Sequence, residues 1–87
     1  MVRISAAQAR PGYRLWLQFK DGVEGTVDLS REVGRGVFAR WQDPVEFARV
    51  FVNPAIGTVC WPGDIDLDPD VLYSEATGKA IPGLGPA

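Results

Sequence analysis

The sequence predicts an α+β fold, with a small antiparallel β-sheet and two or three short helices in a single domain. Three observations support this prediction. Segments with apolar residues at every second position recur along the chain, which is typical of half-buried strands. Turns that contain Gly or Pro separate these segments. The length of 87 residues suits one domain, and a hydrophobic content of 46% is enough for a core.

The first part of the chain predicts three strands. Val2–Gln8 alternates apolar and more polar side chains and is expected to be the first strand. In Tyr13–Phe19 every odd position is apolar, which gives the second strand one apolar face. Asp21-Gly22 follows and is a strong hairpin signal, because both residues adopt positive φ readily. Val23–Asp28 is then the returning strand.

Short helical segments are expected next. Leu29–Val33 is long enough for one helical turn, with Asp28 or Ser30 as its cap. The segment Val37–Trp41 is ambiguous, although its apolar residues at 37, 38 and 41 would share one face of a short helix. A further helical turn is expected over Pro44–Phe47.

A second hairpin is predicted in the middle of the chain. Arg49–Val52 reads as a strand, Asn53–Gly57 as a turn, and Thr58–Trp61 as the strand that returns antiparallel to it. Pro62-Gly63 ends this strand, because Pro lacks the N–H that a ladder needs and Gly tolerates positive φ.

The next segment has an acidic face. Ile65 and Leu67 alternate with acidic residues, and a period of two puts the apolar pair on one face of a short strand and the carboxylates on the other. The acidic residues are Asp64, Asp66 and Asp68.

A capped helix is expected over Pro69–Ala76. The side chain of Asp68 is suited to accept from the free N–H groups of the first turn, and Pro suits the first helical position. Val71 and Leu72 are expected to pack inward, and Gly78 to end the helix. The domain is therefore expected to span residues 1–77. Residues 78–87 contain three Gly and two Pro and are expected to form a loosely ordered tail.

The residue inventory argues against enzymatic chemistry. The chain has no His, which is the commonest general base and metal ligand. Its one Cys has no triad partner to activate it, so we expect Cys60 to be a buried small hydrophobe. No Gly-rich phosphate-binding loop is present. We therefore expect neither catalytic activity nor a cofactor.

The net charge and the hydropathy of the chain indicate which partners and which cellular location to expect. The formal net charge of −2 argues against general nucleic-acid binding, which favours a basic face. No apolar run approaches the roughly 20 residues of a membrane span. The first residues also lack the apolar core of a signal peptide, so a cytoplasmic protein is predicted.

The acidic segment also has a metal-binding interpretation. Asp64, Asp66, Asp68 and Glu75 have the spacing of ligands in an EF-hand calcium loop. Pro69, however, occupies the position where that loop needs Gly with positive φ. Strand-face and helix-cap roles are therefore favoured, and binding of a small ligand or metal by these carboxylates is the alternative.

Three stretches together resemble a known family. They are YRLWLQFKDGVEGTVDLS, GVFARWQDPVEFARVFVN and GTVCWPGDIDLDPDVLY. In this order and spacing the chain resembles, from about Val2 to Ser74, the bacterial domain of unknown function 2442 (DUF 2442). The resemblance implies an α+β domain built on an antiparallel sheet and no settled activity. Relatives resemble stand-alone small proteins, often encoded beside a second small protein as in a toxin–antitoxin pair.

Other relatives carry a helix-turn-helix DNA-binding segment, for which the sequence after Tyr73 is too short. Direct nucleic-acid binding by this chain is therefore not expected. The leading prediction is a non-enzymatic protein-interaction or regulatory module, the antitoxin-like member of a two-protein system. Its expected partner is a small protein encoded nearby, and a homo-oligomer is compatible with this reading. The candidate partner-binding residues are Trp16, Trp61, Asp64, Asp66, Asp68 and Tyr73.

The aromatic candidates leave two alternatives open. Trp16 falls on the polar side of its strand, so either it is exposed to a partner or a helix covers that face. Two of the three Trp are expected in the core, and this is the favoured reading for Trp61. The carboxylates beside it either recruit an Arg-rich partner or only keep a sheet edge soluble.

Overall fold

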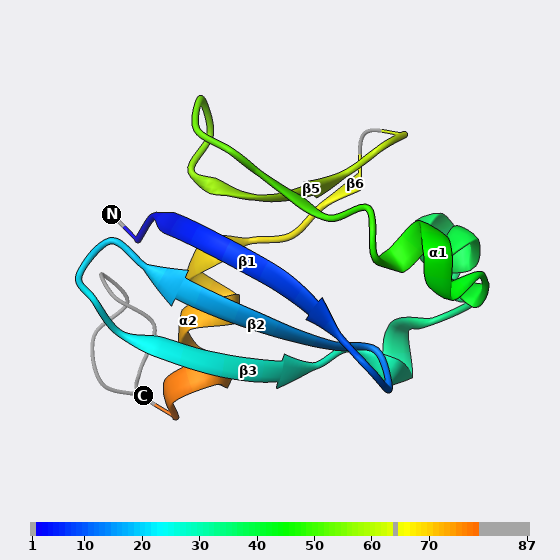
Figure 1. Ribbon diagram of the computed structural model, residues 1–87, viewed down its shortest axis with the longest axis horizontal. Helices are drawn as coiled ribbons and strands as arrows, with labels where there is room; N and C mark the ends of the chain where they lie inside the picture. Colours follow the sequence, from blue (N-terminus) through cyan, green and yellow to red (C-terminus); the bar gives the residue numbers. More distant parts are fainter. Residues whose placement is uncertain (1, 64, 79–87) are drawn as a thin grey trace.

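The computed structural model of the chain describes residues 2–63 and 65–78, and in this part six strands form two three-stranded antiparallel sheets (Figure 1). The N-terminal sheet has the order β1-β2-β3, with β1 at Ile4–Arg10, β2 at Arg14–Phe19 and β3 at Glu24–Asp28. The C-terminal sheet has the order β4-β5-β6, with β4 at Phe51–Asn53, β5 at Thr58–Trp61 and β6 at Ile65–Asp66. The predicted α+β class is confirmed, and the strands are divided between two sheets.

The β2–β3 hairpin forms where it was predicted. Gly22 has a φ of +88° and donates its N–H to the carbonyl of Phe19 at 2.9 Å. The carboxylate of Asp21 accepts from the N–H of Val23 at 3.0 Å. Both turn residues therefore act as the Asp-Gly signal predicts: Gly supplies the backbone conformation, and the Asp side chain binds the chain two residues on.

Strand β1 differs from the prediction in position and in the face it buries. It covers Ile4–Arg10 instead of residues 2–8, and Ile4 pairs with Phe19 while Ala6 pairs with Gln18. Two steps along β1 thus match one step along β2, so Ser5 is the extra residue of a β-bulge. A bulge reverses the alternation of faces. Residues 7 and 9, and not residue 6, consequently pack against the core.

The middle of the chain consists of short helical pieces. Two 3₁₀ helices, η1 at Ser30–Glu32 and η2 at Gly36–Gln42, precede α1 at Pro44–Phe47. The carboxylate of Asp43 caps α1 by accepting from the N–H of Val45 at 3.0 Å. The helical alternative for the ambiguous segment 37–41 is therefore correct, in its tighter 3₁₀ form.

Helix α2 at Pro69–Thr77 begins as predicted and extends one residue beyond the predicted end at Ala76. Asp68 accepts from the N–H of Asp70 at 2.9 Å, and the helix ends at Gly78 with a φ of +73°. Strand β5 also has the predicted bounds, whereas β4 starts two residues later than predicted, at Phe51. The tail predicted for residues 78–87 lies, beyond Gly78, outside the described residues.

The core lies between the two sheets and α2 (Figure 1). It contains an aromatic cluster in which the ring centroid of Trp41 lies 4.6 Å from that of Trp61 and 5.1 Å from that of Phe47. Trp41 and Trp61 are both buried, and the indole N–H of Trp61 donates to the carbonyl of Phe47 at 2.7 Å. The expectation that two of the three Trp belong to the core, Trp61 among them, is confirmed.

Helix α2 reaches the N-terminal sheet at a glycine. A Cβ atom placed on Gly25 of β3 would lie 2.5 Å from the carbonyl oxygen of Ala76 on α2, which is closer than real Cβ atoms come. The absent side chain lets the helix backbone lie directly against the strand. This contact fixes α2 beneath β3.

Candidate protein-interaction site

The six residues predicted to bind a partner do not form one surface. Trp61 and Tyr73 are buried. Asp66 is exposed on β6, opposite Cys60, whereas Asp68 caps α2. Asp64 lies outside the described residues. The predicted acidic edge is therefore divided between two parts of the molecule, and Trp16 lies on a third.

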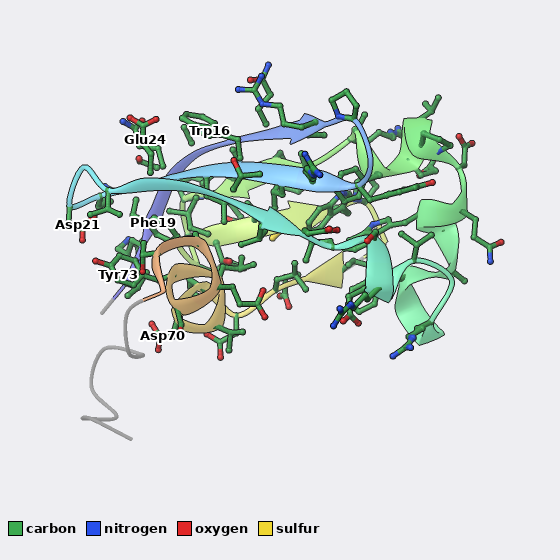
Figure 2. All side chains as sticks on the ribbon, turned by 90° about the horizontal axis from the view of Figure 1, so that it is seen from below. Trp16, Phe19, Asp21, Glu24, Asp70 and Tyr73 are labelled. Atoms are coloured by element: carbon green, nitrogen blue, oxygen red, sulfur yellow. The ribbon has the colours of Figure 1, made fainter. Side chains whose placement is uncertain are left out.

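Trp16 lies on the outer face of the N-terminal sheet, the face turned away from α2. Register places it between Gln8 on β1 and Thr26 on β3, and both neighbours are exposed. Figure 2 shows Trp16 and Glu24 on the side of the sheet opposite the helix. The indole N–H donates to a carboxylate oxygen of Glu24 at 3.2 Å, and the side chain is half-buried. Of the two alternatives for Trp16, the open face is the one observed.

A groove runs between β3 and η1 on one side and α2 on the other, and we call it the β3–α2 groove. Its volume is about 590 Å³. Six apolar residues line it: Val27, Leu29, Phe38, Leu67, Val71 and Leu72. Of these, Val71 was predicted to pack inward, but it is 41% exposed and forms part of the groove wall. The groove therefore offers water-accessible apolar surface on a chain too small to hide all of it.

The rim of the groove is acidic. Four acidic residues contribute to its lining, against one basic residue, Arg31; the acidic residues are Asp28, Glu32, Asp68 and Glu75. Hydrogen bonds from Ser30, with smaller effects of Arg14 and Arg31, lower the pKa of the Asp28 carboxyl below its usual value. This carboxylate therefore stays charged at neutral pH. The groove combines an apolar floor with an excess of negative charge.

The outer face of the C-terminal sheet carries a smaller hollow of about 300 Å³. Phe51 and Ile56 are each 48% exposed beside it, and Cys60 is buried between Phe51 and Asp66. Burial, and secondly the charge of Asp66, raises the pKa of the Cys60 thiol. A protonated, buried thiol is a poor nucleophile. Cys60 is thus the buried hydrophobe that the sequence predicts.

Within residues 2–63 and 65–78, no three His, Cys, Asp or Glu side chains lie close enough to hold a metal ion. None of the helices described there has the length and apolar character needed to cross a membrane.

The β3–α2 groove was not predicted from the sequence. Its walls come from three segments that are separated in the chain, and they meet because Gly25 allows α2 to approach β3. Of the five predicted binding residues that the structure describes, Asp68 is the one that also lines the groove. The one sequence signal for it is Val71, an apolar residue in the first turn of a helix whose neighbour Leu72 fills the core.

Fold and surfaces together define a small α+β domain with an open sheet face and an acidic, apolar-floored groove. The chain belongs to the protein family of unknown function DUF2442, whose profile matches residues 4–78. It is similar to the crystal structure of a candidate DNA-binding protein from Nitrosomonas europaea, with a TM-score of 0.76 and 26% sequence identity. That match covers 90% of this chain and 50% of the other protein, so the chain corresponds to about half of its length. No curated protein matches the chain.

Proposed function

We propose that this domain is a non-enzymatic protein-interaction module, the antitoxin-like member of a two-protein system. Its partner is a small protein encoded nearby, and it binds the domain through a segment that carries Lys or Arg beside apolar side chains. The observation that carries this proposal is the β3–α2 groove, with its apolar floor and acidic rim.

The apolar floor supplies the driving force for association. Val71 is 41% exposed on the groove wall, and Phe38 and Leu67 are partly buried there. Covering such side chains gains roughly 25 cal/mol for each Å² of apolar surface removed from water. A partner segment with aliphatic side chains matches this floor.

The rim selects the charge of the partner. Four acidic residues and one basic residue line the groove, so a basic segment is attracted and an acidic one is repelled. Arg suits this rim because its planar guanidinium pairs with carboxylates in a bidentate manner. The absence of His from the chain and the buried state of Cys60 support a role without catalysis.

The test starts with the protein encoded beside this chain. The two proteins are co-expressed, the complex is purified, and its affinity is measured by titration calorimetry for wild type and for Val71→Arg. The new cation repels a basic partner and occupies the floor, so the affinity should fall by at least about tenfold. Val45→Arg is the matched control, because Val45 is also exposed, at 68%, but lies on α1 away from the groove.

Two results would count against the proposal. If both variants bind like wild type, the groove is not the binding site. If the neighbouring protein does not bind at all, and short peptides of Arg and Val do not bind either, the domain is not this kind of module.

A second candidate function is DNA binding, which the name of the similar Nitrosomonas europaea protein favours. On this chain the surface for it would be the outer face around Trp16, where Arg10 and Arg14 pair across strands. Aromatic rings and Arg side chains on a sheet bind single strands by stacking and charge. Exposed Glu24 and Asp28 on the same face oppose DNA binding.

Fluorescence anisotropy with labelled single- and double-stranded DNA at low salt tests this second candidate function. Binding by the wild type that is lost in the double variant Arg10→Gln/Arg14→Gln would favour DNA binding.

A further inference from the structure

We infer that the partner segment binds in extended form as a fourth strand of the N-terminal sheet, hydrogen-bonded to the free edge of β3. This inference rests on the proposed function and adds the binding mode and the residue pattern of the partner. It concerns the edge of the sheet where the β3–α2 groove opens.

Strand β3 is the last strand of its sheet, and no other described strand pairs with its far edge. The direction of its backbone groups follows from two hydrogen bonds that flank it. The N–H of Phe19 donates to the carbonyl of Val23 at 2.8 Å, and the N–H of Leu29 donates to the carbonyl of Tyr13 at 2.9 Å. On the β3 side these bonds use backbone groups of two odd-numbered residues, Val23 and Leu29, and both groups point toward β2.

In an antiparallel pair the backbone groups of successive residues point alternately toward and away from the neighbouring strand. Gly25 and Val27 therefore direct their N–H and C=O groups to β2. Glu24, Thr26 and Asp28 direct theirs to the open edge. Thr26 and Asp28 are also among the residues that line the β3–α2 groove, so a second chain can reach this edge from the groove.

The other edge of the same sheet is less suited to this role. Strand β1 starts beside the β4–β5 turn, where the N–H of Ile4 donates to the carbonyl of Gly57 at 2.8 Å. Contacts between β1 and both β4 and β5 cover part of this edge. The edge of β3 has no such cover from another strand among the described residues.

The groove lies directly at the free edge of β3. Residues 26–29 form one of its walls, and η1 and α2 form the others. Figure 2 looks onto this edge, with α2 beneath the sheet and the helical segments to one side. A strand added beside β3 would close the mouth of the groove and turn every second side chain into it.

This geometry sets the sequence pattern of the partner. Residues of the added strand that match Val27 point to the groove, where Val71 and Leu72 belong to the apolar lining. Residues that match Glu24, Thr26 and Asp28 point to the outer face, where cross-strand cations pair favourably with the two carboxylates. The predicted segment thus alternates aliphatic residues with Lys or Arg over the five-residue length of β3. Addition of a strand to an exposed sheet edge is a known mode of peptide recognition.

The probe for this inference is a synthetic peptide of about seven residues in which Arg and Val alternate, enough to cover β3. A second peptide has the same composition with the Val residues in one block. Two further peptides carry N-methyl groups on the backbone, one peptide on the nitrogens of its Arg residues and the other on the nitrogens of its Val residues. In an antiparallel pairing the Arg N–H groups face β3, so Arg methylation should weaken binding by about tenfold or more through the loss of backbone hydrogen bonds. The peptide methylated on its Val nitrogens should bind with an affinity within about threefold of that of the unmethylated parent peptide.

A protein variant provides the matched test from the other side. Thr26→Pro removes an N–H that points to the open edge, and Pro is tolerated on edge strands where the N–H faces solvent. Thr26→Val keeps the N–H. We expect the parent peptide to bind Thr26→Val like wild type and Thr26→Pro about tenfold more weakly. Hydrogen exchange should show slowed exchange of the Thr26 and Asp28 amides of the wild-type protein when the peptide is bound.

The outcomes separate the two proposals. Suppose that the parent peptide binds, and that both methylated peptides and the peptide with its Val residues in one block bind as tightly as the parent. The strand mode is then wrong, while the proposed function stands. If both methylated peptides lose binding equally and the Thr26 and Asp28 amides stay unprotected, the strand mode is also wrong. If neither the parent peptide nor the neighbouring protein binds, both proposals fail.

Discussion

The hydroxyl of Tyr73 on α2 donates a hydrogen bond to a carboxylate oxygen of Asp21 at 3.0 Å, across 52 positions of sequence (Figure 2). The same ring lies edge-on to Phe19, with ring centroids 4.8 Å apart. Asp21 belongs to the β2–β3 turn and also accepts from the N–H of Val23. One carboxylate therefore shapes the hairpin turn and fastens the helix to it.

This bond predicts a stability that falls at alkaline pH. The hydrogen bond to Asp21, with smaller effects of burial and of the Asp21 charge, raises the pKa of Tyr73 above its ordinary value of 10.0. The unfolded chain thus releases the proton first, so this stabilisation is complete below about pH 10 and is lost as the pH rises through the folded pKa. Tyr73→Phe should therefore lose less stability than wild type between neutral pH and about pH 11.

Urea unfolding at the two pH values checks this expectation. The Phe variant keeps the contact with Phe19, so it isolates the hydroxyl. An identical alkaline loss in both proteins would show that the Tyr73–Asp21 bond has no part in it.

A second prediction concerns the close approach of β3 and α2. Gly25→Ala would place a Cβ 2.5 Å from the Ala76 carbonyl oxygen, so the helix backbone must shift. Overpacking of this kind costs about 1–3 kcal/mol in the free energy of unfolding. Thr26→Ala, on the exposed side of the same strand, is the control and should change it by no more than about 0.5 kcal/mol. Equal urea midpoints for the two variants would mean that α2 is not held against Gly25.

The elements that could be predicted from the sequence are those whose chemistry is local. Asp21-Gly22 makes its turn with its own side chain and backbone, and Asp68 caps α2 within two residues. These signals need no information about the rest of the fold. The bulge at Ser5 has no such signal, because the segment around it contains small residues that fit either face. Its position follows from the pairing with β2, and this pairing is a property of the folded sheet.

The candidate site was less predictable because it is assembled from distant segments. The period-two alternation of the sequence predicted that the acidic residues 64, 66 and 68 lie together on one face of a short strand. The structure places Asp68 at the N-cap of α2 and in the groove wall, while Asp66 stays on β6 beside another hollow. A change from strand to helix after Leu67 separates them. For Trp16 the sequence left two alternatives, an exposed face or a face covered by a helix, and the structure decides between them because no helix packs on that face among the described residues.

A third prediction compares two buried indoles. Trp61 donates to the Phe47 carbonyl at 2.7 Å, whereas the N–H of Trp41 has no hydrogen-bond partner among the described residues. Both changes to Phe leave a smaller side chain, but only Trp61→Phe also leaves a buried carbonyl unpaired. That carbonyl adds about 1–3 kcal/mol to the cost. Trp61→Phe should therefore unfold at lower urea concentration than Trp41→Phe, and the reverse order would show that packing outweighs the hydrogen bond.

The last prediction separates the two carboxylates that the sequence placed on one edge. Asp68 accepts from the N–H of Asp70 at 2.9 Å and caps α2, so Asp68→Ala should lower the free energy of unfolding by about 0.5–2 kcal/mol. In a domain of this size such a loss lowers the melting temperature by several degrees. Asp66→Ala removes an exposed carboxylate on β6 and should change the stability by less than about 0.5 kcal/mol. Thermal unfolding of both variants decides the matter: if Asp68→Ala is as silent as Asp66→Ala, the start of α2 does not depend on its cap, and the wall of the β3–α2 groove is held by the burial of Leu72 and Tyr73 instead.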